Sequence, residues 1–229
     1  MHNGTTDRLK TELENIAAAM GAKVFGIADL EALLCEHPHF LDHVPGRYSR
    51  AIVMGVRLQK SVLDGIRDKP TPLYFHHYRQ VNYQLDRIAL MIADRLQDLG
   101  HVALAAPASQ VISRTPMFGH VSHRLLGRAA GLGFIGRNGL LVNPRYGAQV
   151  RYVSVLTDAF LEADVEKSGN CGSCRRCIDA CPAGAIGENA EDFNQEACYA
   201  KLTEFTKLPF IGQHICGVCV KQCSGPGNG

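Results

Sequence analysis

The sequence lacks the features that would assign it to a membrane or secreted class. No run approaches the roughly 18 consecutive apolar residues of a membrane-spanning helix. The first segment, MHNGTTDRLKTELENIAAAM, carries charged and amide side chains where a signal peptide has an apolar stretch. No twin-arginine export signal is present. We therefore expect a cytoplasmic protein with no membrane association.

Excess charge and low-complexity segments are also absent. The 229 residues carry a formal net charge of +2, so the total charge does not indicate a nucleic-acid groove. Hydrophobic residues make up 46% of the chain, which is enough for a core and argues against disorder. The length predicts one domain of ordinary size together with a smaller one.

Cysteine is abundant, and its nine copies are unevenly placed. Cys35 stands alone and is interpreted as a buried apolar residue, whereas the other eight lie between Cys171 and Cys223. In a reducing compartment such a concentration favours metal ligands over disulfides. The change in composition near SGNCGSC predicts a domain over 1–165 and a second over 166–229.

The first of these domains alternates helical and strand patterns. A helix through LKTELENIAAAM is expected to be capped by Thr6 and ended by Gly21. A long amphipathic helix is expected from Tyr74 to Leu99, stopped by Gly100. The strands are expected in KVFGIADL, AIVMGVRL, HVALAAPA and AQVRYVSVLTDA. This alternation predicts an α/β layer structure.

The segment CGSCRRCIDACP has the spacing of an iron–sulfur motif. Cys171, Cys174 and Cys177 are two residues apart, and Cys181 follows after three residues and precedes Pro182. In proteins with two 4Fe-4S clusters, the fourth cysteine of such a run ligates the other cluster. A second, matching half of the motif is therefore expected.

Cys198, Cys216, Cys219 and Cys223 supply that second half, with a long insertion after Cys198. One cluster is expected to use Cys171, Cys174, Cys177 and Cys223, and the other Cys181, Cys198, Cys216 and Cys219. Two structural zinc sites are the alternative, although zinc does not require this spacing. Ser224 follows Cys223 where a proline usually stands.

Gly131, Gly133 and Gly136 match the dinucleotide fingerprint G-x-G-x-x-G. That reading is rejected because HRLLGRAA before them has a helical pattern and GLLVNP after them is extended, the reverse of the required order. Two interpretations remain open. The glycines let the backbone approach a large ligand closely, or they form a tight helix-to-strand turn.

The segment GLGFIGRNGLLVNPRYG, the strand ending in LTD and the cysteine motifs resemble the epoxyqueuosine reductase family and its short relatives. FGIADL, AIVMGVRL, YFHHYRQVNYQLD and APASQ resemble the same group in the same order. The resemblance implies a nitroreductase-like, cobalamin-binding α/β core, shared with reductive dehalogenases. A small α+β ferredoxin-like module with two 4Fe-4S clusters is expected to follow it and to pass single electrons to the cobalamin.

The resemblance also points to contacts with the cofactor. Tyr78 matches a tyrosine near the cobalamin in the family. Ser109 and Gln110 follow a strand and either contact a ligand or cap a helix. His120 and His123, three apart on an expected helix, are expected to line a pocket. The remaining candidate cofactor contacts are Gly131, Gly133, Gly136, Arg137 and Asn138.

The chain departs from the family at its proton donor. Ser113 stands where epoxyqueuosine reductases have an aspartate, and no carboxylate lies between Leu99 and Asp158. Tyr78, His120 and His123 are the candidate replacements. With little net charge, tRNA is not the expected substrate, and a small molecule is expected instead.

A ferredoxin or flavodoxin is the expected electron donor. The alternative function is a non-catalytic electron carrier that docks with a partner redox enzyme.

Overall fold

The computed structural model describes residues 3–114 and 117–226, which separate into two compact units. The first unit contains 1–56, 82–132 and 151–167, and the second contains 57–81, 133–150 and 168–229. One division thus falls beside the expected boundary at residue 165. Two earlier segments nevertheless group with the cysteine-rich tail, so the division into contiguous domains stays a prediction.

The first unit is built on one sheet with the strand order β1-β2-β8-β3. Its strands are β1 (Val24–Asp29), β2 (Arg50–Arg57), β8 (Val150–Thr157) and β3 (Ala103–Ala106). β1 runs antiparallel to β2, with Ile27 opposite Ile52, and β3 runs antiparallel to β8. β1, β8 and β3 lie within the segments that the apolar patterns predicted, and β2 begins one residue before its segment. Ile27 and Ile52 are completely buried.

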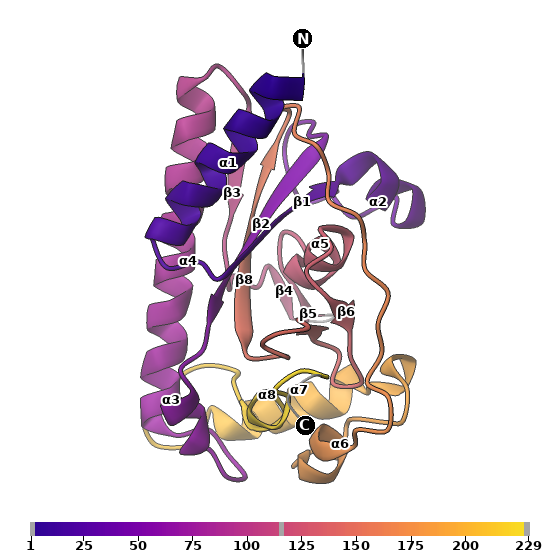
Figure 1. Cartoon of the computed structure of the whole chain (residues 1–229). Helices are drawn as coiled ribbons and strands as arrows, with labels where there is room; N and C mark the ends of the chain where they lie inside the picture. The colour runs from indigo at the N-terminus through magenta and orange to yellow at the C-terminus, as the bar shows by residue number, and fades with distance from the viewer. Residues whose placement is uncertain (1–2, 115–116, 227–229) are drawn as a thin grey trace. The chain divides into compact units, whose positions relative to one another are not determined.

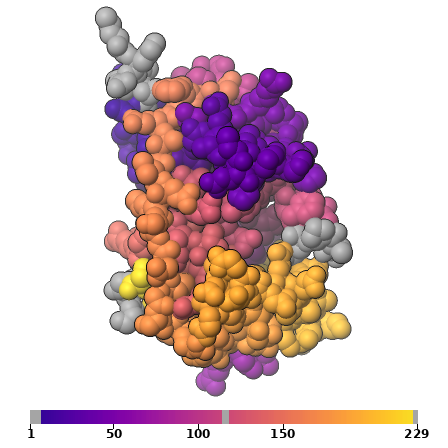
Figure 2. All heavy atoms as spheres, turned by 90° about the vertical axis from the view of Figure 1, so that its right-hand side faces the viewer, coloured from indigo at the N-terminus to yellow at the C-terminus, as the bar shows by residue number. Residues whose placement is uncertain are grey.

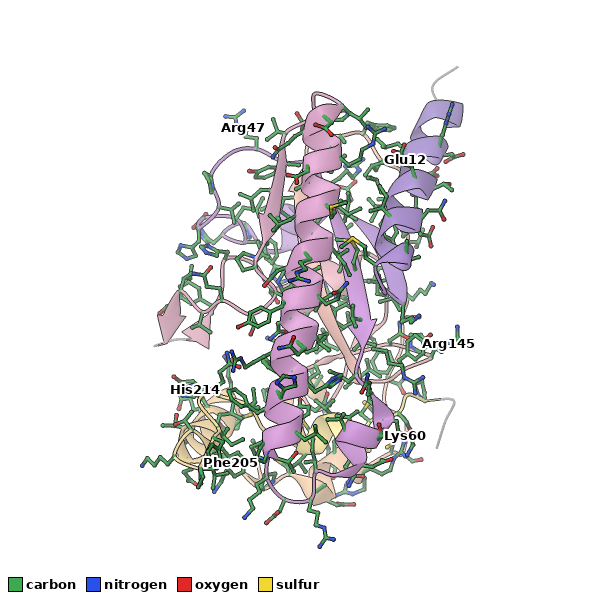
Figure 3. The ribbon with its side chains drawn as sticks, turned by 90° about the vertical axis from the view of Figure 1, so that its left-hand side faces the viewer. Glu12, Arg47, Lys60, Arg145, Phe205 and His214 are labelled. Carbon is green, nitrogen blue, oxygen red and sulfur yellow. The ribbon has the colours of Figure 1, made fainter. Side chains whose placement is uncertain are left out.

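Helices cover this sheet (Figure 1), with α1 (Asn3–Ala19) and α4 (Pro72–Asp98) on one side and α5 (His123–Ala129) on the other. Arg95 of α4 donates a hydrogen bond to Glu12 of α1 at 2.6 Å. Glu12 is labelled in Figure 3. α1 begins at Asn3, so Thr6 lies within the helix and the expectation that it is the cap is wrong. The long helix α4 matches its expected range to within two residues.

The short helix α2 (Leu30–Glu36) corrects one expectation. Asp29 caps it by accepting a hydrogen bond from the backbone N–H of Glu31 at 2.9 Å. Leu30 and Leu33 face the core, because residues three apart lie on one face of a helix. Cys35 lies off that face and is exposed, so its interpretation as a buried residue is wrong.

The second unit consists mainly of short elements. They are α3 (Lys60–Asp64), the first turns of α4, the strand pair β6 (Phe134–Ile135) and β7 (Leu141–Val142), α6 (Arg176–Ala180), η1 (Ala190–Asp192), α7 (Gln195–Phe205) and α8 (Val218–Gln222). α6 packs against α8. Lys221 of α8 donates to the carbonyl of Ile66 at 2.5 Å, which ties the tail to segment 57–81.

The insertion between Cys198 and Cys216 is folded. It contains most of α7, and the ring of His214 stacks on Tyr199 with centroids 4.9 Å apart (Figure 3). Residues 168–226 are drawn in orange to yellow in Figure 2, and the preceding segment from about residue 150 is also drawn in orange. In the described part of the chain, no helix combines the length and apolarity that crossing a membrane requires.

Candidate metal centre

The first cysteine motif folds as a turn followed by a single helix, α6. The backbone N–H of Cys174 bonds to the carbonyl of Cys171 at 3.1 Å, which closes the turn. Cys177 lies on α6, and Cys181 ends the helix with an extended backbone. The two-residue gaps therefore place three thiols around one turn, and the longer gap carries the fourth past the end of the helix.

Cys177 lies among the thiols of the first expected set. Burial raises its pKa to about 11, with added repulsion from the thiolates of Cys223, Cys171 and Cys174. Burial also raises the pKa of Cys223, and Cys171 and Cys174 add to that shift. The last cysteine of the chain is thus grouped with the first three cysteines of the first motif.

The remaining four thiols form a second group. Burial raises the pKa of Cys216 to about 11, and the thiolates of Cys198 and Cys181 contribute. Burial and Cys181 likewise raise the pKa of Cys198. Desolvation raises the pKa of Cys219, and Cys216, Cys198, Cys181 and, least, Cys177 add to that shift. The thiols that influence one another's pKa are therefore those of the two sets that the spacing predicted, and their ligation of clusters stays a prediction.

This arrangement suits a cluster better than separate thiols. Buried thiolates that repel one another require positive charge nearby, and a 4Fe-4S cluster supplies one iron for each thiolate. Among residues 3–114 and 117–226, no three His, Cys, Asp or Glu side chains are arranged to hold a single metal ion. The donor set fits two clusters in its chemistry and in its grouping.

Arg137 fixes the loop of the first motif. Its guanidinium donates hydrogen bonds to the backbone carbonyls of Glu188, Cys174 and Gly172, the last at 2.9 Å. The sequence predicted Arg137 as a cofactor contact, and the structure instead shows its donors engaged by the chain. Direct contact of Arg137 with a cofactor stays a prediction.

Gly136 allows Cys171 to approach the segment between β6 and β7. A Cβ at Gly136 would lie 3.4 Å from Cys171 Sγ and 2.6 Å from a methyl group of Val142. Gly147 has a similar role, because a Cβ there would overlap the carbonyl of Cys223. Glycine at these two positions makes room for the cysteine-bearing segments themselves.

At Gly131 and Gly133, the missing Cβ makes room for backbone outside the cysteine motifs. Gly131 has a φ of 67°, and the carbonyl of Val165 occupies the space of its missing Cβ. The carbonyl of Val142 occupies the corresponding space at Gly133. These contacts favour the tight-turn interpretation for this pair. Contact of either glycine with a cofactor stays a prediction.

The two candidate histidines do not share a helix face, contrary to expectation. Ser122 caps α5 by accepting the N–H of Leu125, so the helix begins at His123 and His120 lies in the preceding loop. His123 Nε2 bonds to the carbonyl of Pro107 at 3.0 Å, and Nδ1 bonds to Ser154 Oγ at 2.9 Å.

Burial lowers the pKa of His123 to about 4. The neutral ring must donate from Nε2, because a carbonyl can only accept, so Nδ1 accepts the hydroxyl proton of Ser154. These contacts favour a structural histidine over a proton donor.

The other candidates occupy loops and helix surfaces. Tyr78 lies half-buried on α4, with its ring 6.2 Å from that of Tyr74. Ser109 and Gln110 are exposed just after β3. Neither caps a helix, since the next helix in the described chain is α5, so that alternative is wrong. Ser113 lies in β4 (Ser113–Arg114), which pairs with β5 (Met117–Phe118).

Sequence reasoning missed the side chains that support the loop after β3. Asp86 Oδ1 accepts the backbone N–H of Ala108 at 2.8 Å, and Arg151 Nε donates to Asn82 Oδ1 at 3.2 Å. Asp86 and Asn82 come from α4, and Arg151 comes from β8. No short-range signal marks such residues, because their partners are distant in the sequence.

The fold resembles that of solved reductive dehalogenases and epoxyqueuosine reductases. A catabolic reductive dehalogenase, solved in complex with 3-bromo-4-hydroxybenzoic acid, matches 92% of this chain and 31% of its own with a TM-score of 0.73 at 20% identity. An epoxyqueuosine reductase was solved with an epoxyqueuosine-modified tRNA stem loop. It matches 87% of this chain and 58% of its own, with a TM-score of 0.57 at 22% identity. The expected α/β fold class is confirmed.

Curated relatives agree with this likeness. A tetrachloroethene reductive dehalogenase of Desulfitobacterium hafniense is 28% identical over 223 residues, 95% of this chain and 37% of that protein. The epoxyqueuosine reductase of Bacillus anthracis is 33% identical over 144 residues, 58% of this chain and 37% of that enzyme. The epoxyqueuosine reductase of Bacillus subtilis (strain 168) is 37% identical over 86 residues, which are 38% of this chain and 22% of that enzyme.

No protein-family model matches the chain. The resemblance that the motifs predicted is confirmed, and the chain is a homologue of epoxyqueuosine reductases and reductive dehalogenases. It spans less than two fifths of the length of these curated relatives.

Proposed function

We propose that the chain is an iron–sulfur oxidoreductase whose eight grouped cysteines hold two 4Fe-4S clusters that pass single electrons to cobalamin. The observation that carries the proposal is the packing of α6, which ends at Cys181, against α8, which ends at Cys223. The mutual effects of the thiols on their pKa values support the crossed grouping. Homology to two kinds of reductase supports the redox assignment.

The residues of the chain bind the clusters and keep them close together. A bound 4Fe-4S cluster takes up and releases one electron at a time. Each set contains one cysteine from the other half of the motif, so neither half binds its cluster alone. Cys177 of the first set also contributes to the raised pKa of Cys219 of the second, which supports two neighbouring sets. Arg137 holds the loop of the first set in position.

The cobalamin assignment rests mainly on the relatives. The structure of one reductive dehalogenase is described as suggesting a mechanism for B12-dependent dehalogenation. It matches 77% of this chain and 25% of its own, with a TM-score of 0.62 at 21% identity. In this chain Ser109 and Gln110 are exposed after β3, where their side chains fit contacts with the amide groups of a ligand. Arg137 and His123 bond to backbone carbonyls. Bound cobalamin would supply reductive chemistry at cobalt.

In this proposal, a residue other than an aspartate donates the proton. Ser113 occupies the position of the family's aspartate, and His123 has its N–H committed to a carbonyl. Tyr78 and His120 remain as donors. A small molecule, rather than modified tRNA, is the proposed substrate, and a ferredoxin or flavodoxin is the proposed electron donor.

Metal analysis of anaerobically purified protein tests the clusters. We expect about eight iron and eight sulfide per chain, four of each for every cluster. Cys181→Ser should disturb the same cluster as Cys198→Ser, and Cys223→Ser the same cluster as Cys174→Ser, as followed by electron paramagnetic resonance (EPR). Zinc in place of iron, or a single cluster that survives in Cys198→Ser/Cys216→Ser protein, would contradict the proposal.

A non-catalytic electron carrier is the second candidate, favoured by serine at the acid position and by the engaged nitrogens of His123. Incubation with cobalamin, removal of free ligand and a cobalt count separate the two candidates. One retained cobalt per chain, with reduction of a small epoxide or organohalide, supports the enzyme. Protein with both clusters that retains no corrinoid and reduces no such substrate supports the carrier.

A further inference from the structure

Asn138 has a buried hydrogen-bond donor with no protein partner. The residue lies between β6 and β7 and is only 3% exposed. Its Oδ1 accepts the backbone N–H of Leu140 at 3.2 Å, which fixes the orientation of the amide, because an N–H requires an oxygen acceptor. Asn138 Nδ2 is left buried and without a partner. Such orphaned donors are rare in native proteins and indicate a missing acceptor.

A cysteine thiol lies in the surroundings of Asn138. Cys171 Sγ lies 3.4 Å and Asn138 Oδ1 lies 3.3 Å from the same point, the ideal Cβ position of Gly136. Cys171 belongs to the first set of thiols. Among the described residues of the second unit, Asn138 Nδ2 is the only buried side-chain nitrogen or oxygen that lacks a partner. The orphaned donor therefore lies in the neighbourhood of one set of metal ligands.

We propose that Asn138 Nδ2 donates a hydrogen bond to a sulfur of the cluster held by Cys171, Cys174, Cys177 and Cys223, and that this bond raises the reduction potential of that cluster. The inference rests on the proposed function, since it needs the cluster to be present. Because Asn138 Nδ2 has no partner in the structure, Cys171 Sγ included, the accepting atom is a sulfide of the bound cluster. Three successive residues then serve one loop, because Gly136 makes room for Cys171, Arg137 holds the loop and Asn138 bonds to sulfur.

The direction of the effect follows from charge. Reduction adds one electron to the cluster, while no covalent bond forms or breaks and no proton moves. The added negative charge strengthens a hydrogen bond from the amide N–H to sulfur. A bond that is stronger in the reduced state favours reduction, and hydrogen bonds to sulfur are among the factors that set cluster potentials.

A redox titration followed by EPR tests the inference in the full chain. In Asn138→Leu protein with its full iron content, the potential of one cluster should fall and that of the other should stay unchanged. Asn82→Leu is the matched control, because Asn82 is a buried asparagine of the first unit whose Oδ1 accepts from Arg151. It should shift neither potential.

A labelling experiment separates a hydrogen bond to sulfur from a merely structural role. Protein carrying ¹⁵N in its asparagine side-chain amides should show a ¹⁵N coupling to the reduced cluster in pulsed EPR. The coupling should persist in Asn170→Ser, which changes the asparagine next to Cys171, and should vanish in Asn138→Leu. If Asn138→Leu does not fold, the presence or absence of the coupling in labelled wild-type and Asn170→Ser protein decides the question.

The outcomes distinguish this inference from the function on which it rests. Two intact clusters with no such coupling, or with potentials that Asn138→Leu leaves unchanged, overturn the role of Asn138 alone. Protein that binds no iron after anaerobic reconstitution overturns both the role of Asn138 and the iron–sulfur function.

Discussion

Arg137 shows how a single side chain organises the first cysteine motif. Its planar guanidinium bonds to three carbonyls, and lysine cannot reproduce that geometry. We expect Arg137→Met to lower the free energy of unfolding by about 2 kcal/mol, the typical contribution of hydrogen bonds to a charged group. Iron should also be lost to a chelator faster than from wild type. Urea denaturation and the rate of iron loss measure the two effects.

Arg145→Met is the control for Arg137→Met. Arg145 is an exposed arginine of the same unit and lies over the ring of Tyr146, 5.2 Å from its centroid. Its replacement should change the free energy of unfolding by less than about 0.5 kcal/mol. Equal losses in the two variants would show that Arg137 has no special role in holding the loop.

His123 makes the stability of the chain depend on pH. Its pKa is lowered from the ordinary 6.5 to about 4 in the folded protein, so the unfolded chain binds the proton more tightly. The stabilisation is present above pH 6.5 and is lost as the pH falls toward 4. Between pH 7 and pH 5 the contribution of His123 should fall by about 2 kcal/mol.

Urea denaturation at pH 7 and pH 5 checks this expectation. In His123→Gln protein the difference between the two pH values should be smaller than in wild type by that amount, because glutamine does not titrate. An identical pH dependence in wild type and variant would mean that His123 ionises normally in the fold.

At the scale of elements, two helices end at glycines with different surroundings. Gly100 follows α4 with a φ of 86° and has open space around its Cα, whereas Gly131 follows α5 with a φ of 67° and packs against the carbonyl of Val165. Gly100→Ala should cost about 1 kcal/mol from backbone strain alone. Gly131→Ala should cost about 3 kcal/mol, since overlap with the carbonyl adds to the strain.

Thermal and urea denaturation of the two glycine variants provide the comparison. The ordering, with Gly131→Ala less stable than Gly100→Ala, is the decisive result. Equal destabilisation would show that the segment around Val165 moves aside without cost, and the close packing would then not explain the glycine.

At the scale of the whole molecule, charge argues against a tRNA substrate. The chain has a net charge of +2, and non-specific binding to nucleic acid depends on several Lys or Arg contacts to phosphate. We expect binding to unmodified and epoxyqueuosine-modified tRNA stem loops to be equally weak, with Kd values above about 10⁻⁶ M at physiological salt. Fluorescence anisotropy across a salt series measures this. A clear preference for the modified stem loop would contradict the proposed substrate class.

The sequence by itself determined the local features of this protein. Apolar periodicity located the four strands of the main sheet and the long helix α4, because each pattern lies within one element. Cysteine spacing predicted the two sets of thiols, because two-residue and three-residue gaps control which sulfurs face the same side of a turn. The family resemblance depended on the same contiguous motifs.

Only the tertiary structure decided which distant residues meet. It joined segments 57–81 and 133–150 to the cysteine-rich tail in one compact unit, placed Asp86 beneath the loop after β3, and engaged both ring nitrogens of His123. It also left Asn138 Nδ2 without a partner. These outcomes depend on packing between segments far apart in the chain. No local pattern of side chains specifies the partner of a hydrogen bond that forms only when the chain is folded.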